Sequence, residues 1–167
     1  EKETPEDVVC FLNQYFTEMV NIVLNNGGTI DKFIGDGLLA IFGAPIIYED
    51  HAQRAIDSAR MMQFCLAQIN KGRAKNEKEP IRIGVAINTG YAIVGNIGSD
   101  QKMEYTVIGD TVNTAARLEE LNKKHNTKIL ISQATLDQAT KELKVRKMPS
   151  ILLRGKEKQV DYYEVIE

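Results

Sequence analysis

The sequence has few cysteines and no metal-binding pattern built on them. Only two occur in 167 residues, Cys10 and Cys65, and they lie far apart in segments with helical patterns. No CxxC pair and no histidine pair at ligand spacing accompanies them, which argues against a zinc site. The number of cysteines alone would permit one disulfide. We expect instead two free, buried thiols in a reducing compartment.

Excess positive charge and long hydrophobic runs are also missing. Lysine and arginine number 21 against 23 acidic residues, and the formal charge is -2. A nucleic-acid-binding surface is basic, so we expect no nucleic-acid partner. No apolar run approaches the ~18 residues of a membrane span, and residues 1–7 are too charged and polar for a signal peptide. We therefore expect a cytoplasmic location, with the cytoplasmic part of a membrane protein as the alternative.

The chain contains enough apolar residues for one folded domain. Hydrophobic residues make up 43% of the sequence, which at this length is sufficient for a core. No internal repeat or low-complexity tract divides it. We treat residues 1–167 as a single domain.

Helical and strand patterns alternate along the chain. Thr4 and Pro5 followed by two acids form a helix start, and residues 25–28 form a stop signal. Further helices are predicted over residues 50–71, 111–124 and 133–141, and strands over 29–33, 38–42, 81–88, 91–97, 104–108, 128–131, 143–153 and 160–166. This interleaving predicts an α+β fold, with one mixed sheet and helices packed on one face. A ferredoxin-like βαββαβ core with extra C-terminal strands is the simplest match.

The first candidate site is the predicted hairpin turn at residues 35–37. Asp36 lies between two glycines there, so its carboxylate is exposed and can face a metal ion. An Asp-Gly pair is also a common turn sequence, chosen for its backbone shape. Taken alone, the hairpin favours this structural interpretation.

The second candidate site is a strand, a glycine turn and a helix over residues 104–117. Asn113 and Arg117 are four residues apart and share one helix face. An amide beside a guanidinium suits a sugar and a phosphate. Equally, Arg117 could pair with Glu120 or be solvated, and the spacing alone does not decide between these interpretations.

Together these segments resemble the class III adenylyl and guanylyl cyclase catalytic domain. The resemblance extends over nearly the whole chain and rests on several spaced motifs in the right order, which is more specific than any single motif. The matching segments are residues 29–36, 40–45, 50–55, 84–90, 94–99 and 105–117.

The resemblance implies a site for two divalent cations, Mg²⁺ or Mn²⁺, held by two aspartates. Asp36 matches the second aspartate. The family's first aspartate lies on a strand just before the first helix, so no residue in 1–167 is assigned to it, and the domain is expected to lack that strand. Asp31, beside Lys32, and Asp110, in a turn, are poor substitutes.

The resemblance also implies conversion of ATP to 3′,5′-cyclic AMP and pyrophosphate. Arg117 matches the residue that stabilises charge on the α-phosphate in the transition state, and Asn113 matches the residue that orients the ribose. Arg154 falls where the family usually has a lysine that contacts the terminal phosphates. Lys156 is a possible second contributor, although a solvated turn is its simpler interpretation.

Lys32 and Thr106 match the two positions that read the base. Adenine offers an acceptor at N1 and a donor at its 6-amino group; a lysine only donates, and a threonine hydroxyl can accept. Guanine presents the reverse pattern, which would leave buried groups unpaired. We therefore expect ATP as substrate. The alternatives are a guanylyl or relaxed-specificity cyclase and a catalytically silent cyclase-like domain.

The resemblance finally implies a head-to-tail homodimer with two shared sites. Asp36 would come from one subunit, and Lys32, Asn113 and Arg117 from the other. An N-terminal sensor or membrane module is expected in the full-length protein. The fold plan alone would also permit a small-molecule-binding regulatory domain, because fold does not fix function.

Overall fold

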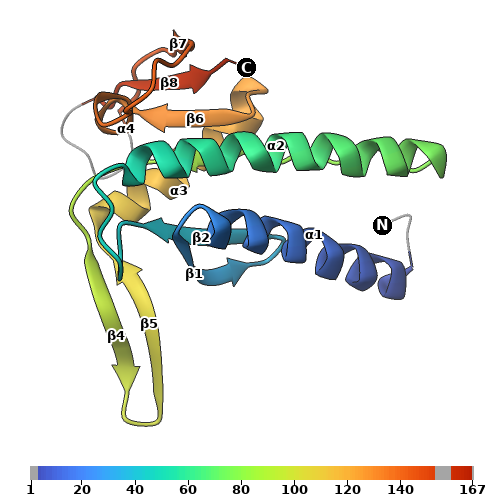
Figure 1. The fold of residues 1–167 in the computed structure, drawn as a ribbon, viewed down its shortest axis with the longest axis horizontal. Helices are drawn as coiled ribbons and strands as arrows, with labels where there is room; N and C mark the ends of the chain where they lie inside the picture. The colour runs from blue at the N-terminus through green and yellow to red at the C-terminus, as the bar shows by residue number, and fades with distance from the viewer. Residues whose placement is uncertain (1–3, 153–158, 167) are drawn as a thin grey trace.

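The computed structural model describes residues 4–152 and 159–166, and these form an α+β fold (Figure 1). The helices are α1 (Pro5–Asn25), α2 (His51–Lys75), α3 (Asp110–His125) and α4 (Gln133–Asp137). The strands are β1 (Gly28–Ile34), β2 (Gly37–Phe42), β3 (Val85–Ile87), β4 (Ile93–Ser99), β5 (Lys102–Ile108), β6 (Ile129–Ser132), β7 (Val145–Lys147) and β8 (Tyr162–Val165). The predicted fold class is confirmed.

The described strands divide into three hydrogen-bonded groups instead of one sheet. A four-stranded sheet has the order β3-β6-β8-β7, while β1-β2 and β4-β5 are antiparallel pairs. In the larger sheet β3 is parallel to β6, and the other neighbours are antiparallel. A mixed sheet is therefore present, as predicted.

Side chains of α2 explain why the strand predicted over residues 81–88 shortens to β3. The Asn70 amide donates to the Ile81 carbonyl and accepts from the Ile81 N–H, both at 2.8 Å. Gln63 donates to the Ile83 carbonyl at 3.1 Å. These backbone groups are satisfied by a helix, so they do not require a strand neighbour there.

The start of α1 follows the predicted signals closely. The Thr4 hydroxyl accepts a hydrogen bond from the Asp7 N–H at 3.2 Å, and Pro5 occupies the first turn. The C-terminal hairpin is shorter than predicted, since β7 and β8 continue only through an isolated bridge between Ile151 and Val160. Its predicted closing glycine, Gly155, lies outside the described residues.

Strand β6 is buried on both faces, and this corrects the expectation that the helices cover one face. Ile129 and Ile131 pack with Ile56 and Ala59 of α2, whereas Leu130 packs with α3. Successive strand residues point to opposite faces. The unbroken apolar run of β6 therefore has α2 on one side of the sheet and α3 on the other.

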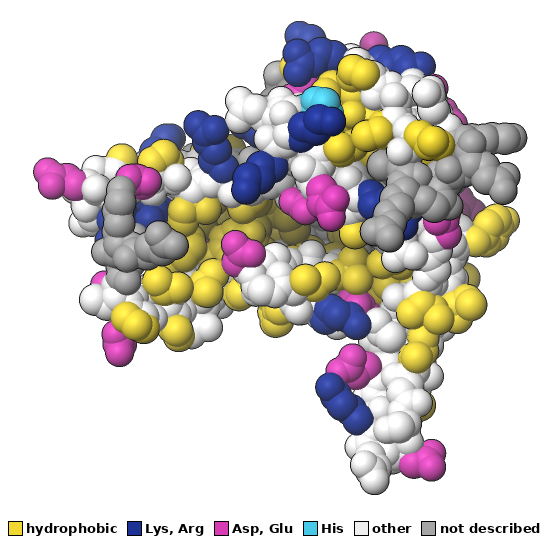
Figure 2. Space-filling view, turned by 180° about the vertical axis from the view of Figure 1, so that it is seen from behind, with side chains coloured by type: hydrophobic (Ala, Val, Ile, Leu, Met, Phe, Trp, Pro, Cys, Tyr) yellow, Lys and Arg dark blue, Asp and Glu magenta, His cyan; other side chains and the backbone are white. Residues whose placement is uncertain are grey.

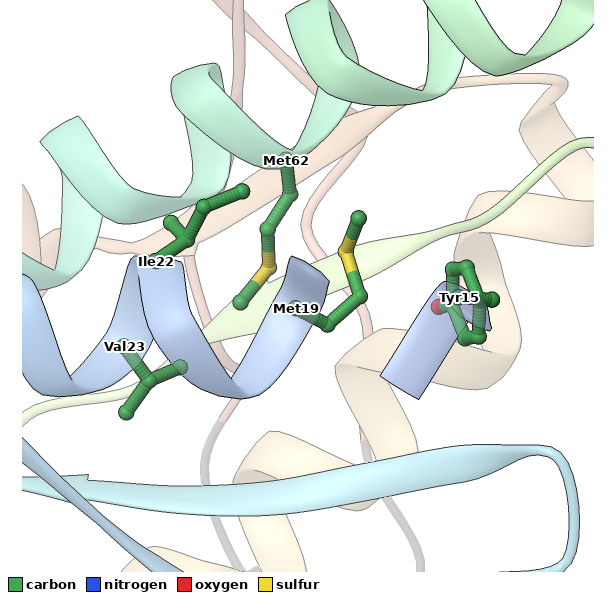
Figure 3. Close-up of a cluster of buried hydrophobic side chains, with 5 residues drawn as sticks. All are labelled: Tyr15, Met19, Ile22, Val23 and Met62. Atoms are coloured by element: carbon green, nitrogen blue, oxygen red, sulfur yellow. The ribbon is translucent and has the colours of Figure 1, made fainter. Parts of the chain in front are cut away.

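A separate core cluster joins α1 to α2 and to the β1-β2 hairpin. Its buried side chains are Tyr15, Met19, Ile22, Val23 and Met62 (Figure 3). Met62 points from α2 toward the α1 side chains in this view. The hairpin thus packs on α1 and α2, and Val85 of β3 packs against the same cluster.

Both cysteines are free, but the expectation that both are buried is wrong. Cys10 is exposed on α1, and Cys65 is half-buried on α2, where burial raises the pKa of its thiol. Cys10 falls outside the set of α1 residues that enter the core. Within the described ranges, no helix has the length and apolar character that crossing a membrane requires.

Strands β4 and β5 form a long hairpin that extends away from the rest of the molecule (Figure 1). Ser99 pairs with Lys102, so the turn contains only two residues. A Cβ on Gly98 would lie 2.0 Å from the Lys102 carbonyl oxygen, so this position requires glycine. Large apolar side chains on the hairpin are exposed, including Ile93, Met103 and Ile108.

The back of the molecule carries a hollow in which hydrophobic side chains gather (Figure 2). Among residues 4–152 and 159–166, β1 pairs only with β2, and β3 pairs only with β6. Apolar side chains on β1, on β3 and just before β3 are only partly buried, including Ile30, Val85 and Ile83. One edge of β1 and one edge of β3 therefore have no strand neighbour within the described chain.

Met61 and Met62 provide a matched test of the α1-α2 core. Met62 is 8% exposed and Met61 is 47% exposed. We expect Met62→Ala to lower the free energy of unfolding by about 2–4 kcal/mol, because it leaves a cavity. Met61→Ala should change it by less than about 0.5 kcal/mol. Urea unfolding of both variants measures the difference, and equal losses would contradict this packing.

Candidate functional site

The β1-β2 turn holds Asp36 at the tip of the hairpin. Ile34 pairs with Gly37, so Gly35 and Asp36 form a two-residue turn. Gly35 has φ +60°, as the first position of such a tight turn requires. Asp36 is exposed, and its side chain makes no hydrogen bond or ion pair within the described residues.

Asp36 adds negative charge to a region between α1 and α3. Burial raises the pKa of Tyr15, and the Asp36 carboxylate raises it further. Burial, Glu120 and Asp36 raise the pKa of Glu119. A cation bound at Asp36 would relieve this repulsion.

The chemistry of Asp36 fits a hard divalent cation, since carboxylate oxygens are preferred ligands of Mg²⁺ and Mn²⁺. In the part of the chain that the structure describes, no group of three or more His, Cys, Asp and Glu side chains could hold a metal ion. A cation at Asp36 would therefore need further ligands from substrate, water or another chain segment.

Strands β1 and β5, which carry the two residues predicted to read a base, are in contact. Thr106 is buried on β5. Lys32 lies on β1 with its Nζ 3.9 Å from the Glu104 carboxylate of β5. Glu104 is also paired with Lys102 at 2.8 Å, and a hydrogen bond from Lys102, aided by the Lys32 charge, lowers its pKa.

A buried carboxylate lies beside Lys32. The Asp31 side chain is fully buried, and its carboxylate is 3.5 Å from Lys32 Nζ. Neither Asp31 oxygen has a hydrogen-bond partner among the described residues. The sequence motif gave Asp31 and Glu104 no role, because neither the bulge that buries Asp31 nor the contact between β1 and β5 is readable from local sequence.

Asn113 and Arg117 of helix α3 lie outside the set of buried residues of that helix. Thr114, Leu118 and Leu121 of this helix are buried, whereas Asn113 is exposed and Arg117 is half-buried. No hydrogen bond or ion pair to either side chain is found within the described residues. The alternative pairing of Arg117 with Glu120 is therefore not present, and both groups are available to a ligand.

The two residues predicted to contact the terminal phosphates, Arg154 and Lys156, lie outside the described residues. His125 Nε2 lies 3.1 Å from the Tyr162 hydroxyl. This contact joins the end of α3 to β8.

Chemically, the arrangement combines two kinds of group. Asp36 offers a carboxylate to a cation at the hairpin tip. Lys32, Thr106, Asn113 and Arg117 offer hydrogen-bonding and cationic groups on β1, β5 and α3. Such a set suits a phosphorylated ligand that carries a polar base.

Comparison with known proteins gives a consistent result. The family model described as adenylate and guanylate cyclase catalytic domain matches residues 1–165. Adenylate cyclase 1 of Rhizobium meliloti is 34% identical over 99% of this chain, which spans only 25% of that protein.

Two solved structures superpose over almost the whole chain. The guanylyl cyclase Cya2 is 37% identical with a TM-score of 0.88, covering 98% of this chain and 82% of that one. The adenylyl cyclase CyaB from P. aeruginosa is 31% identical with a TM-score of 0.88, covering 99% and 85%. The similar structures thus include both substrate types.

The charge of Asp36 can be detected at Tyr15. We expect Asp36→Asn to lower the pKa of Tyr15 in metal-free buffer, because a neutral side chain no longer disfavours the tyrosinate. Burial, the larger cause, should keep that pKa above its ordinary value. NMR of ring-labelled tyrosine, assigned with Tyr15→Phe, measures the shift. Asp57→Asn on α2 is the matched control, and an unchanged Tyr15 pKa in Asp36→Asn would disprove the proximity.

Proposed function

The chain belongs to the adenylate and guanylate cyclase catalytic domain family, and we propose that it is the catalytic domain of an adenylyl cyclase. It converts ATP to 3′,5′-cyclic AMP and pyrophosphate. The observation that carries this proposal is the contact between β1 and β5, which carry Lys32 and Thr106. Asn113 and Arg117 follow on α3, the next element of the chain.

The choice of ATP rests on the Lys32 ammonium. It donates to adenine N1, while the Thr106 hydroxyl accepts from the 6-amino group. With guanine, the ammonium would face the N1–H donor, and an unpaired buried polar group costs about 1–3 kcal/mol. A specific point favours a second candidate, a relaxed-specificity or guanylyl cyclase, because the Thr106 hydroxyl can also donate and Cya2 is a guanylyl cyclase.

The chain's own residues position the substrate for ring closure. Asn113 orients the ribose so that its 3′-hydroxyl lies in line with the α-phosphate. Arg117 stabilises the charge that develops on the phosphate oxygens, and Arg154 binds the terminal phosphates. Asp36 would hold one of the two divalent cations of this proposal, and the cations would lower the pKa of the 3′-hydroxyl and neutralise phosphate charge.

A homodimer completes the proposed site. The exposed apolar side chains of the β4-β5 hairpin, including Ile93 and Met103, are typical of a surface that contacts another subunit. In a head-to-tail dimer, Asp36 of one subunit faces Lys32, Asn113 and Arg117 of its partner, although Lys32 and Asp36 share a hairpin. Two-fold symmetry gives two equivalent sites.

A strand preceding α1 is proposed to carry the other metal aspartate. The unpaired edges of β1 and β3 and the partly buried apolar side chains between them support a strand at that position. An N-terminal sensor or membrane module would then precede this cytoplasmic domain in the full-length protein.

Substrate preference is the first test. The full-length protein with Mn²⁺ should turn over ATP with a kcat/KM at least about tenfold above that for GTP, because guanine leaves polar groups unpaired. Lys32→Glu should reverse the order, since a carboxylate accepts from guanine N1–H. Steady-state kinetics with both nucleotides decides the question. Equal or faster GTP turnover by the unmodified protein contradicts the proposed base recognition.

Shared sites are tested by mixing inactive variants. Asp36→Ala and Arg117→Ala homodimers should each be nearly inactive. After exchange they should recover about a quarter of the activity, because half of the dimers are hybrids with one intact site.

The matched control for this mixture is Asn113→Ala with Arg117→Ala. In the proposed dimer, both substituted residues of a site come from the same subunit, so every site of a hybrid dimer stays defective. Recovery in the control, or none in the first mixture after verified subunit exchange, argues against shared sites.

A further inference from the structure

The buried Asp31 beside the exposed Lys32 has no function in the chemistry described above. We propose that Asp31 is a positioning residue that holds the Lys32 ammonium for base recognition and thereby determines nucleotide specificity. This inference rests on the proposed adenylyl cyclase function and extends it to a residue that never touches the substrate.

The environment of Asp31 does not suit a residue kept for stability. Its side chain is fully buried, and neither carboxylate oxygen accepts a hydrogen bond within the described chain. A buried carboxylate is costly unless it is paired and hydrogen-bonded. Within the described chain, the Lys32 ammonium lies at ion-pair distance from the Asp31 carboxylate, at 3.5 Å. The two side chains therefore act as a unit.

A β-bulge produces this arrangement. Ile30 pairs with Ala40 and Lys32 pairs with Leu39, which leaves Asp31 as the extra residue of β1. Bulges commonly redirect a side chain next to an active site. Phe33 packs on Phe16 of α1 with ring centroids 4.5 Å apart. Lys32 immediately precedes Phe33, so its side chain points to the opposite side of β1.

The ammonium has three N–H donors, and two carboxylates compete for them. Asp31 approaches at 3.5 Å from β1, and Glu104 at 3.9 Å from β5. Glu104 is half-exposed and shared with Lys102, so the buried Asp31 is the more fixed of the two. Held between both strands, Lys32 keeps one donor for adenine N1 and offers guanine no acceptor.

The test uses Asp31→Asn in the full-length protein, with Asp57→Asn as control. Asp57 of α2 is also ion-paired, to Lys141 at 2.6 Å, but lies outside the proposed site. Steady-state kinetics gives KM and kcat for ATP and GTP. Calorimetry gives dissociation constants for 3′-deoxy-ATP and 3′-deoxy-GTP, which lack the attacking hydroxyl. Thermal unfolding measures stability.

The expected result is a selective loss of adenine affinity. In Asp31→Asn the KM for ATP and the dissociation constant of 3′-deoxy-ATP should rise about tenfold, because a charge-assisted contact that orients Lys32 is lost. Values for the guanine nucleotides, and kcat, should change little. The melting temperature should not fall, because the replaced carboxylate is buried and its oxygens accept no hydrogen bond within the described chain. Asp57→Asn should leave the ATP-to-GTP ratio unchanged.

Three results would overturn the inference. Equal losses for both nucleotides with a lower melting temperature mean that Asp31 is structural. A higher Mn²⁺ requirement means that it binds metal. If the unmodified protein prefers ATP but Asp31→Asn leaves the ATP-to-GTP ratio unchanged, the inference about Asp31 fails and the proposed function stands. If the unmodified protein shows no ATP preference, the proposed function itself fails.

Discussion

Burial of β6 on both faces is the constraint on which the rest of the structure depends. Ile129 and Ile131 fix α2 on one side of the sheet, and Leu130 fixes α3 on the other. Asn113 and Arg117 flank the buried side chains of α3, which include Leu118 and Leu121, so the anchoring of this helix also fixes their positions. The proposed catalytic groups therefore depend on a core strand that touches no substrate, so core variants should disturb catalysis through α3.

The β1-β2 hairpin contributes charged side chains to the proposed site. Lys32 lies between two carboxylates, and Asp36 lies at a turn whose negative charge raises the pKa of nearby groups. In the proposed function, the first arrangement holds a hydrogen-bond donor in place and the second binds a cation. The β1-β2 hairpin thus carries a cationic group, Lys32, and an anionic group, Asp36. The bulge and the Gly35 turn set the directions of these two side chains.

Local signals in the sequence predicted the local structure well. The Thr4 cap, the Gly35 turn and the spacing of Asn113 and Arg117 all act within a few residues. Features that depend on residues distant in sequence were not predicted. They are the burial of Asp31, the exposure of Cys10, and the hydrogen bonds by which Asn70 of α2 satisfies the Ile81 backbone where a strand was expected. The apolar run of β6 did carry a signal, since a strand without alternation is buried on both faces.

In the proposed dimer, one subunit reads the adenine base while the other holds the metal. A crystal structure of the full-length protein with 3′-deoxy-ATP and Mn²⁺ is the decisive measurement. We expect Lys32 Nζ within hydrogen-bond distance of adenine N1, and a Mn²⁺ ion in the same site bound by Asp36 of the partner subunit. A base bound away from Lys32, or Asp36 and Lys32 of a single chain on the same nucleotide, would contradict it.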